Sequence, residues 1–246
     1  MLVSVIIPYF NDELNIKKSV SSVLDQTYKK IEILIIDDEN TIHSNNVLKK
    51  YKNIKKIKIL KNNSNYGVAL ARNKGIKNSK GELVAFLDSD DYWKKNKIEE
   101  QVLVFKKHNI DVCYTNYYGF KNNNKILYKV RPPNRMNFKK FLYECPISCS
   151  SVVLKKKLLI NHKFKNLKTK EDYLLWLDLS KANYKFYGIN KFLSFYRIRK
   201  NSLSSLHLNK FISAFKIYSN HMKFNFFFSL ILVSRLYINA FFKKYL

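Results

Sequence analysis

The sequence predicts an α/β protein built on a Rossmann-like mixed sheet whose N-terminal half is parallel, followed by a C-terminal helical extension. Short apolar runs alternate with helical periodicities over the first ninety residues, which is the pattern of parallel strands with crossover helices. Beyond residue 91 this alternation gives way to the signals of a mixed sheet. We expect one domain over residues 1–203, with halves at 1–91 and 92–203, and the extension over 204–246.

In the parallel half, strands are expected at residues 2–8, 31–37, 54–60 and 83–88. Between the first two strands, apolar side chains recur at helical spacing, and Asn11 or Asp12 is available as the N-cap. A second helix begins after Gly67 and turns Val68, Ala71 and Ile76 inward. The buried residues expected in the first helix are Ile16, Val20, Val23 and Leu24.

Right-handed crossovers place the loops after the first, second and fourth strands at one edge of the sheet. Asp12, Asp38 and the acids at 88–91 therefore converge, although they are far apart in sequence. In the second half, the patterns predict a helix at about 93–108, a strand from Asp111, strands around 125–130 and 148–154, and an amphipathic helix from Glu171.

The segment LVAFLDSDD delivers Asp88, Asp90 and Asp91 to the end of a buried strand. Open α/β sheets bind ligands at this edge. Because carboxylates packed so closely repel one another, a divalent cation such as Mg²⁺ or Mn²⁺ would stabilise the cluster and leave positions free for a substrate diphosphate. The alternative is a solvated acidic turn that caps the helix after it.

The net charge of +28 points to a polyanionic neighbour: nucleic acid, an anionic membrane surface or phosphorylated substrates. No acidic residue follows Asp178, so the positive charge is concentrated at the C-terminal end. A basic nucleic-acid-binding protein is one alternative. The aromatic residues cluster with aliphatic ones instead of standing singly on a basic face, so no nucleic-acid partner is expected.

Residues 204–246 are aromatic and basic. Phe211, Phe215, Tyr218 and Met222 share one helical face, and an apolar run at 224–234 is interrupted soon afterwards by Arg235. This run is too short to span a bilayer, and its aromatics and lysines suit the interface of an anionic leaflet. The alternatives are a helical hairpin packed on the domain and a dimer interface.

Five segments occur in one order along the chain: VSVIIPYFND, IIDDEN, NYGVALARNKGI, GELVAFLDSDD and KEDYLLWLDL. Together they resemble a family 2 glycosyltransferase with a GT-A fold, over residues 2–203. The resemblance implies inverting, metal-dependent transfer of one sugar from a nucleotide sugar, with a UDP-sugar expected, to a hydroxyl group. A sugar nucleotidyltransferase is disfavoured because the chain has no glycine before Gly67 for the usual glycine-rich loop.

The resemblance assigns Pro8, Tyr9 and Asp12 to the nucleotide pocket and Asp38 to the edge of the base. The alternative for Asp38 is a helix cap. Where the family usually has Asp-Asp-Gly-Ser, residues 37–40 are Asp-Asp-Glu-Asn, so the turn lacks its glycine. Arg72 resembles the arginine that braces the nucleotide and the acidic loop, and its alternative is a surface arginine.

In the acidic loop, the resemblance gives Asp88 and Ser89 donor contacts and makes Asp90 the metal ligand. Asp172 is the candidate catalytic base, at a helix N-terminus that favours the ionised carboxylate; otherwise it is an ordinary first-turn acid. Arg197 and Arg199 are expected to pair with phosphates, Arg199 standing where the family often has histidine. Trp176 either faces the acceptor or packs in the core.

The acceptor implied by these features is a polyprenyl-diphosphate-linked saccharide or another surface glycan. The expected location is cytoplasmic, peripheral at the inner face of a bacterial membrane.

Overall fold

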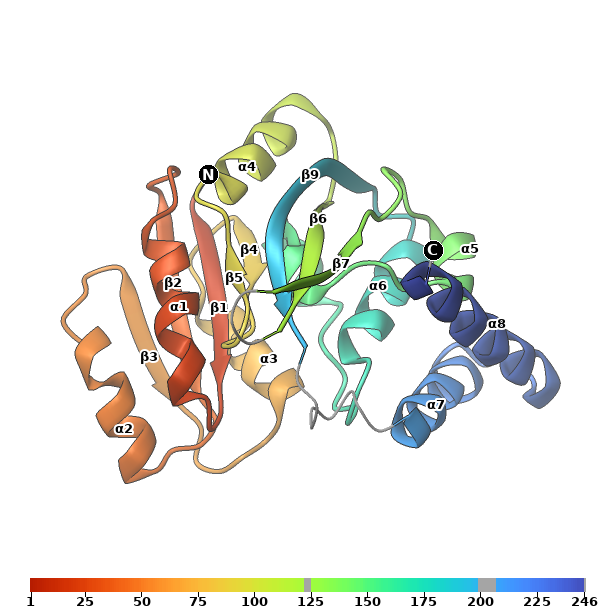
Figure 1. Cartoon of the computed structure of the whole chain (residues 1–246), viewed down its shortest axis with the longest axis horizontal. Coiled ribbons are helices and arrows are strands. Elements are labelled where there is room, and N and C mark those ends of the chain that lie inside the picture. The colour runs from red at the N-terminus through yellow and green to blue at the C-terminus, as the bar shows by residue number, and fades with distance from the viewer. Residues whose placement is uncertain (122–124, 199–206, 246) are drawn as a thin grey trace.

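A computed structural model describes residues 1–121, 125–198 and 207–245. Its centre is a mixed sheet with helices on both faces, as the sequence predicts (Figure 1). The strand order is β3-β2-β1-β4-β8-β6-β9-β5, and β7 pairs with β6. The active-site loops described below lie along one edge of this sheet.

The parallel half contains the strands β1 to β4 and the helices α1 to α3. The strands are β1 (Val3–Tyr9), β2 (Ile31–Asp37), β3 (Ile57–Lys61) and β4 (Leu83–Phe86), and all their mutual pairings are parallel. The helices are α1 (Glu13–Leu24), α2 (Ile42–Leu48) and α3 (Val68–Asn78), and a short 3-10 helix follows α2 at Lys49–Tyr51. No helix was expected from the sequence where α2 lies.

The second half adds antiparallel pairings. It contains β5 (Tyr92–Trp93), α4 (Lys97–Lys107), β6 (Val112–Phe120), β7 (Ile126–Val130), α5 (Phe138–Tyr143), β8 (Val153–Lys155), α6 (Glu171–Lys181) and β9 (Phe186–Arg197). Short 3-10 helices lie at Cys149–Ser151 and Lys156–Ile160. β8 is antiparallel to both β4 and β6, whereas β9 is parallel to β6 and antiparallel to β5.

Three expectations for this half need correction. The strand predicted around 148–154 is instead a 3-10 helix at Cys149–Ser151 followed by the short strand β8. The helix predicted from residue 93 begins at Lys97, because Tyr92 and Trp93 pair with β9 as a short strand. The helix from Glu171 is buried on almost every side, with Leu174, Trp176 and Leu177 no more than 1% exposed, so it is a core helix and not an amphipathic one. The sheet covers one side of it, and the C-terminal helices cover another.

The core lies on both faces of the sheet. Because side chains alternate along a strand, Val5 and Ile7 of β1 point into the cluster under α1, and Ile6 points into the cluster on the opposite face. The second cluster continues through α3, α5 and α6 into the C-terminal helices. Gly75 of α3 lies so close to Ile6 that an added Cβ would lie 2.5 Å from the Ile6 side chain, which lets this helix pack tightly on β1.

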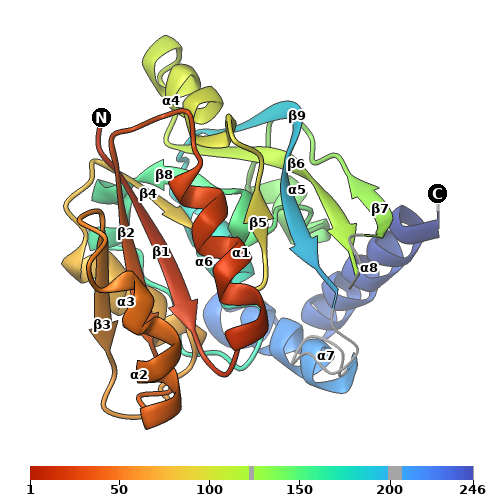
Figure 2. The same cartoon turned by 60° about the vertical axis from the view of Figure 1, so that its left-hand side comes forward.

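The C-terminal segment forms a hairpin of α7 (His207–Lys216), a π-helical turn (Ile217–His221) and α8 (Phe226–Tyr245). It packs beside α5 and α6, as Figures 1 and 2 show. Along α8, Ser229, Leu232, Val233 and Leu236 are buried against the domain. The alternative of a hairpin packed on the domain therefore describes the inner face of this segment. None of the helices in the described ranges is long and apolar enough to cross a membrane.

Candidate active site

The acidic loop after β4 is fixed by a bond within the loop and by bonds to two other segments. The main-chain N–H of Asp88 donates to Ser150 Oγ (3.1 Å), and the main-chain N–H of Asp91 donates back to the Asp88 carbonyl (3.0 Å). Arg197, at the end of β9, donates its main-chain N–H to Asp91 Oδ1 (2.8 Å) and its Nε–H to the Asp90 carbonyl (3.0 Å). These bonds fix the shape of the turn, in which Asp88 and Asp90 are partly exposed and Asp91 is buried.

Arg72 connects the two halves of the domain. Its guanidinium is 2% exposed and donates to Asp88 Oδ1 and to Glu171 Oε1, each at 2.6 Å. The two carboxylates raise the pKa of Arg72 well above its ordinary value, against the opposing effect of burial. The arginine expected to brace the acidic loop does so, and it also positions the first residue of α6.

The loops after β1 and β2 meet the acidic loop, as the crossover argument predicts. Ser89 Oγ donates to Asp12 Oδ2 (2.6 Å), and the main-chain N–H of Asn11 donates to Glu39 Oε2 (3.0 Å). Asp12 occupies the N-cap position of α1, but its side chain makes no capping bond and turns to Asn15 and Ser89 instead. Three segments separated along the chain therefore form one continuous loop surface.

Asp38 is almost fully engaged within the protein. Its carboxylate accepts bonds from the Asn62 side chain (2.5 Å) and from the main-chain N–H groups of Tyr66 (3.1 Å) and Gly67 (2.8 Å), and the residue is 3% exposed. It thus ties the start of α3 to the end of β2, in keeping with the cap-like alternative. Oδ2 accepts one of these bonds and retains a lone pair that a nucleobase N–H could use.

The turn that lacks the family's glycine is stabilised in another way. Asn40 adopts the left-handed conformation (φ 50°), which asparagine tolerates better than most residues. The Asp37 carboxylate accepts bonds from the main-chain N–H groups of Glu39 and Asn40 and from Ser44 Oγ. The turn therefore keeps a defined shape without glycine.

Tyr9 and its neighbour Phe10 point in opposite directions. The Tyr9 ring is fully buried in the cluster beneath α1, and burial raises the pKa of its hydroxyl to about 12. Only its main chain, which accepts a bond from the N–H of Asp38, lies at the loop surface, so the Tyr9 ring itself is not available there. Phe10 is 49% exposed. The outward direction of Phe10 could have been expected from strand alternation, since Pro8 is partly exposed and Tyr9 points inward.

A cavity of about 410 Å³ joins the two halves of the domain. Asp88 and Arg72 line it from one side, and Glu171 and Asp172 line it from the N-terminus of α6. Tyr117 of β6 and Tyr196 of β9, with ring centroids 6.2 Å apart, complete the wall with Val68, Ser148, Cys149, Lys168, Thr169 and Lys170. The two tyrosines had no recognisable signal in the sequence, because only the pairing of β6 with β9 brings them together.

The electrostatics of Asp172 differ from the expectation that the helix N-terminus favours its ionised form. Burial, followed by the charge of Glu171, raises the pKa of Asp172 to about 7, and Arg72 and the main-chain N–H of Tyr173 only partly oppose them. That N–H donates to Asp172 Oδ1 at 2.7 Å. A carboxylate whose pKa lies near neutrality is a stronger base than an ordinary aspartate.

Three further residues were expected at or near the site. Arg197 lies against the acidic loop, with its guanidinium 4.7 Å from the centre of the Phe120 ring. Arg199 lies outside the described residues. Trp176 is fully buried, so of its two alternatives the structure supports core packing.

The donor set of the acidic loop fits a divalent cation bound jointly with a substrate. Asp91 Oδ2 is buried with no hydrogen-bond partner in the described part of the chain, and burial and the charges of Asp90 and Asp88 raise the pKa of Asp91 well above its usual range. Across the described ranges, no three His, Cys, Asp or Glu side chains gather as a metal-binding group. Mg²⁺ and Mn²⁺ are commonly bound through one or two carboxylates and completed by phosphates and water. Asp90, with Asp88 beside it, can supply such a partial set.

A mixed α/β sheet with an acidic loop, a bridging arginine and a facing carboxylate defines a sugar-transferring enzyme of the GT-A class. Residues 4–163 match the family described as Glycosyl transferase family 2, and the chain belongs to it. The protein is therefore a glycosyltransferase, and the sugar nucleotidyltransferase alternative is set aside.

Similar proteins include two bacterial enzymes of known name. The chain is 41% identical over 206 residues to the Escherichia coli UDP-Glc:alpha-D-GlcNAc-diphosphoundecaprenol beta-1,3-glucosyltransferase WfgD, covering 83% of this chain and 80% of that one. It is 34% identical over 206 residues to the putative teichuronic acid biosynthesis glycosyltransferase TuaG of Bacillus subtilis, covering 83% and 82%.

Among solved structures, the chain resembles Staphylococcus aureus TarS 1-349 in complex with UDP-GlcNAc, with a TM-score of 0.74, 21% identity and coverage of 95% of this chain and 70% of that chain. It also resembles the Pyrobaculum calidifontis mannosyltransferase PcManGT in complex with GDP-Man and Mn²⁺, with a TM-score of 0.69, 13% identity and coverage of 91% and 64%. At these identities the likeness concerns the fold, and it agrees with the predicted GT-A architecture.

Proposed function

We propose that this glycosyltransferase moves glucose from UDP-glucose to a hydroxyl of N-acetylglucosamine carried on diphosphoundecaprenol. The observation that carries the chemistry is the single cavity lined by both Asp88 and Asp172. The substrates are suggested by WfgD and by WfaP, an E. coli enzyme of the same printed activity that is 38% identical over 204 residues.

In the proposed reaction, the acceptor hydroxyl oxygen attacks C1 of glucose while the bond from C1 to the β-phosphate oxygen breaks. Asp172 takes the hydroxyl proton, and UDP leaves on the opposite face of the sugar. Attack from that face inverts the α-linkage of UDP-glucose and gives the β-linkage named for the E. coli relatives. General-base catalysis of this kind contributes about 10²- to 10⁴-fold.

The donor would lie along the loop surface formed after β1, β2 and β4. Phe10 is exposed beside Asp38 and is placed to stack on the uracil ring. Asp88 and Ser89 would contact the ribose, and the Arg197 guanidinium lies next to the acidic loop, where the diphosphate would come. A divalent cation at Asp90, Mg²⁺ or Mn²⁺, would supply Lewis-acid stabilisation of the leaving diphosphate.

We further propose that the outer face of α8 rests on an anionic membrane surface at the cytoplasmic side, where a lipid-linked acceptor would be found. Phe227 and Ile231, one turn apart, are 76% and 55% exposed, and Ile238 further along is 52% exposed. The absence of acidic residues after Asp178 makes this end of the chain complementary to anionic headgroups.

Transfer of radiolabelled glucose from UDP-glucose to a synthetic GlcNAc-diphospho-lipid tests the proposed reaction. We expect transfer in the presence of Mn²⁺ or Mg²⁺, loss of transfer with a chelator, and recovery when metal is added back. Asp90→Ala should weaken UDP binding in the presence of metal while leaving metal-free binding unchanged.

Metal-independent transfer would remove Asp90 from the proposed role. Transfer from another UDP-sugar, with none from UDP-glucose, would keep the reaction class and overturn the donor.

A further inference from the structure

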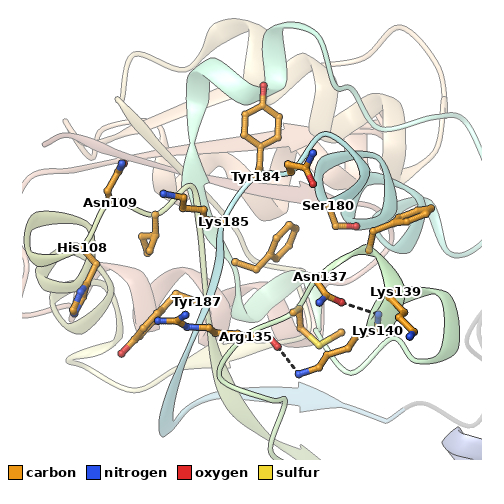
Figure 3. A pocket seen from close by; sticks show the side chains of 15 residues that line it. His108, Asn109, Arg135, Asn137, Lys139, Lys140, Ser180, Tyr184, Lys185 and Tyr187 are labelled. Carbon is orange, nitrogen blue, oxygen red and sulfur yellow. Dashed lines mark hydrogen bonds between the residues drawn. The ribbon is translucent and has the colours of Figure 1, made fainter.

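A second cavity lies away from the active site, between the end of α4, the start of α5, the end of α6 and the start of β9. Its volume is about 860 Å³, and residues 108–110, 135–140 and 183–187 line it together with Ser180. Figure 3 shows the labelled side chains arranged around this space. No residue lines both this cavity and the active-site cavity.

The two cavities lie at opposite ends of shared elements. Asp172 and Ser180 are eight residues apart on α6, which corresponds to about 12 Å along the helix axis. Tyr187 and Tyr196 are nine residues apart on β9, roughly 30 Å along the strand. The two cavities are therefore separate sites on the molecule, with no lining residue in common.

The second cavity is strongly basic. Arg135, Lys139, Lys140 and Lys185 contribute four positive charges, and none of the lining residues is acidic. Within the described chain, none of these four side chains forms an ion pair with a carboxylate. Asp111, the acid that accepts the main-chain N–H of Lys185, is already paired with Lys155 Nζ at 3.0 Å. The positive potential of the cavity is therefore not neutralised from within the described protein.

Part of this basic set is held in position. Lys140 Nζ donates to the Arg135 carbonyl (3.1 Å), and the main-chain N–H of Lys140 donates to Asn137 Oδ1 (2.9 Å), as the dashed lines in Figure 3 mark. These bonds join the loop before α5 to the first turn of the helix. Lys140 is thus tethered to this loop, and all four cationic residues are exposed to solvent, where a ligand can reach them.

The remaining surface suits a sugar better than a lone ion. Buried apolar side chains line it from two clusters, Met136 and Phe186 from one and Ile110 from the other, and the His108 ring stacks on Tyr187 with centroids 5.3 Å apart. Apolar and aromatic surfaces pack against the C–H faces of pyranose rings, and the amides of Asn109 and Asn183 can bond to hydroxyls. Small-molecule pockets are typically about 300 to 1,000 Å³, so this volume suits a ligand of several rings.

We propose that this cavity is a second binding site, for an oligosaccharide that carries carboxylate or phosphate groups. The basic side chains would pair with the anionic groups while the aromatic and amide side chains contact the sugar rings. Binding there does not depend on the proposed reaction, because no active-site residue takes part.

Hydrogen–deuterium exchange of the full-length chain with a hyaluronan tetrasaccharide, in the presence of UDP and Mn²⁺ at saturating concentration, tests this proposal. We expect protection over residues 135–140 and 183–187, and much weaker protection with the neutral tetrasaccharide of N-acetylglucosamine. Calorimetry should give at least tenfold weaker hyaluronan binding for the double variant Arg135→Ala/Lys185→Ala.

A matched control is Lys52→Ala/Lys55→Ala, which removes the same charge from exposed positions after α2. Its binding should change less than twofold. Equal losses in the two double variants, or inorganic phosphate binding as tightly as the tetrasaccharide, would reduce the effect to general charge attraction and overturn the proposal.

Protection of these segments by a single-stranded oligonucleotide at lower concentrations than hyaluronan would assign the cavity to nucleic acid instead. Absence of glucose transfer would leave this result untouched, because the assay measures binding without turnover.

Discussion

Asp172 and Glu171 are adjacent carboxylates with different environments. Glu171 forms a 2.6 Å ion pair with Arg72. Asp172 instead lines the cavity, and its pKa is raised to about 7. Neighbouring carboxyl groups held in different environments commonly divide structural and catalytic roles. The structure thus separates the residue that positions α6 from the residue proposed to accept the proton.

The pKa of Asp172 predicts how transfer depends on pH. The proposed base works when deprotonated, so kcat/KM should rise tenfold per pH unit below about 7 and level off above it. Asp172→Asn should bind UDP normally and lose about two to four orders of magnitude in transfer. Its remaining rate should not rise with pH in this way. Rate profiles from pH 5 to 9 measure both effects. A rise of kcat/KM centred near pH 4, or near-normal transfer by the variant, would remove Asp172 from the mechanism.

Phe10 is the subject of a second prediction at this scale. Stacking of a base on an aromatic ring contributes about 1–3 kcal/mol, so Phe10→Ala should weaken UDP binding by about 5- to 150-fold. Leu14→Ala is the matched control, since Leu14 is 87% exposed on the first turn of α1. Titration calorimetry with UDP compares the two variants, and equal affinities would contradict stacking on Phe10.

The sequence predicted main-chain placement in the site better than side-chain direction. The convergence of Asp12, Asp38 and the acidic loop followed from strand order alone, and the structure confirms it. The burial of the Tyr9 ring was not foreseen, because the motif locates the loop but does not say which aromatic faces inward. The raised pKa of Asp172 was also out of reach, because it depends on burial by segments distant in sequence.

At the scale of elements, regular crossover units were easier to predict than pieces defined by tertiary contacts. The bounds 31–37 of β2 and the start of α3 after Gly67 are confirmed. β5 has only two residues and exists because β9 pairs with it, so no local pattern marks it. Similarly, α6 has an acidic start that suggested amphipathicity, and only the packing of α5, α7 and α8 shows that it is buried.

The contact of α6 with the C-terminal hairpin depends on a pair of buried hydroxyls. The hydroxyl oxygens of Tyr173 and Tyr218 lie 2.7 Å apart, and Tyr218 Oη also donates to the Leu142 carbonyl (2.7 Å). Tyr173 directly follows Asp172, so these bonds connect the hairpin to the proposed base. The hairpin is therefore part of the framework of the active site.

This pair predicts a difference between two tyrosine variants. Tyr218→Phe removes the donor to the Leu142 carbonyl, while the Tyr173 hydroxyl keeps its bond to the Phe141 carbonyl, and should lower the free energy of unfolding by about 1–3 kcal/mol. Tyr237→Phe should change it little, because the Tyr237 hydroxyl is buried with no hydrogen-bond partner in the described ranges. Urea unfolding measures both variants, and equal losses would show that these hydroxyl bonds add nothing to stability.

At the scale of the whole molecule, the hairpin has two chemically different faces. Leu232, Val233 and Leu236 close the core of the domain, whereas Phe227 and Ile231 face outward. Deleting the hairpin would therefore expose the core beneath it and would not isolate a membrane effect. The membrane proposal is better tested by changing the outer face alone.

Phe227→Ser/Ile231→Ser should lower binding to vesicles that contain phosphatidylglycerol by at least tenfold, because burying one such side chain fully contributes about 1.5–3 kcal/mol. The matched control is Ile42→Ser/Ile160→Ser, which alters side chains that are 81% and 69% exposed on the catalytic domain. Sedimentation with the vesicles measures binding of both variants and of the unaltered chain.

Binding of the unaltered chain should weaken in phosphatidylcholine vesicles and at high salt, because lysine and arginine attract the anionic surface and salt screens that attraction. If the two double variants bind equally well, or if lipid charge and salt have no effect, the outer face of α8 is not a membrane contact. In that case sedimentation equilibrium would show whether a second copy of the chain covers it.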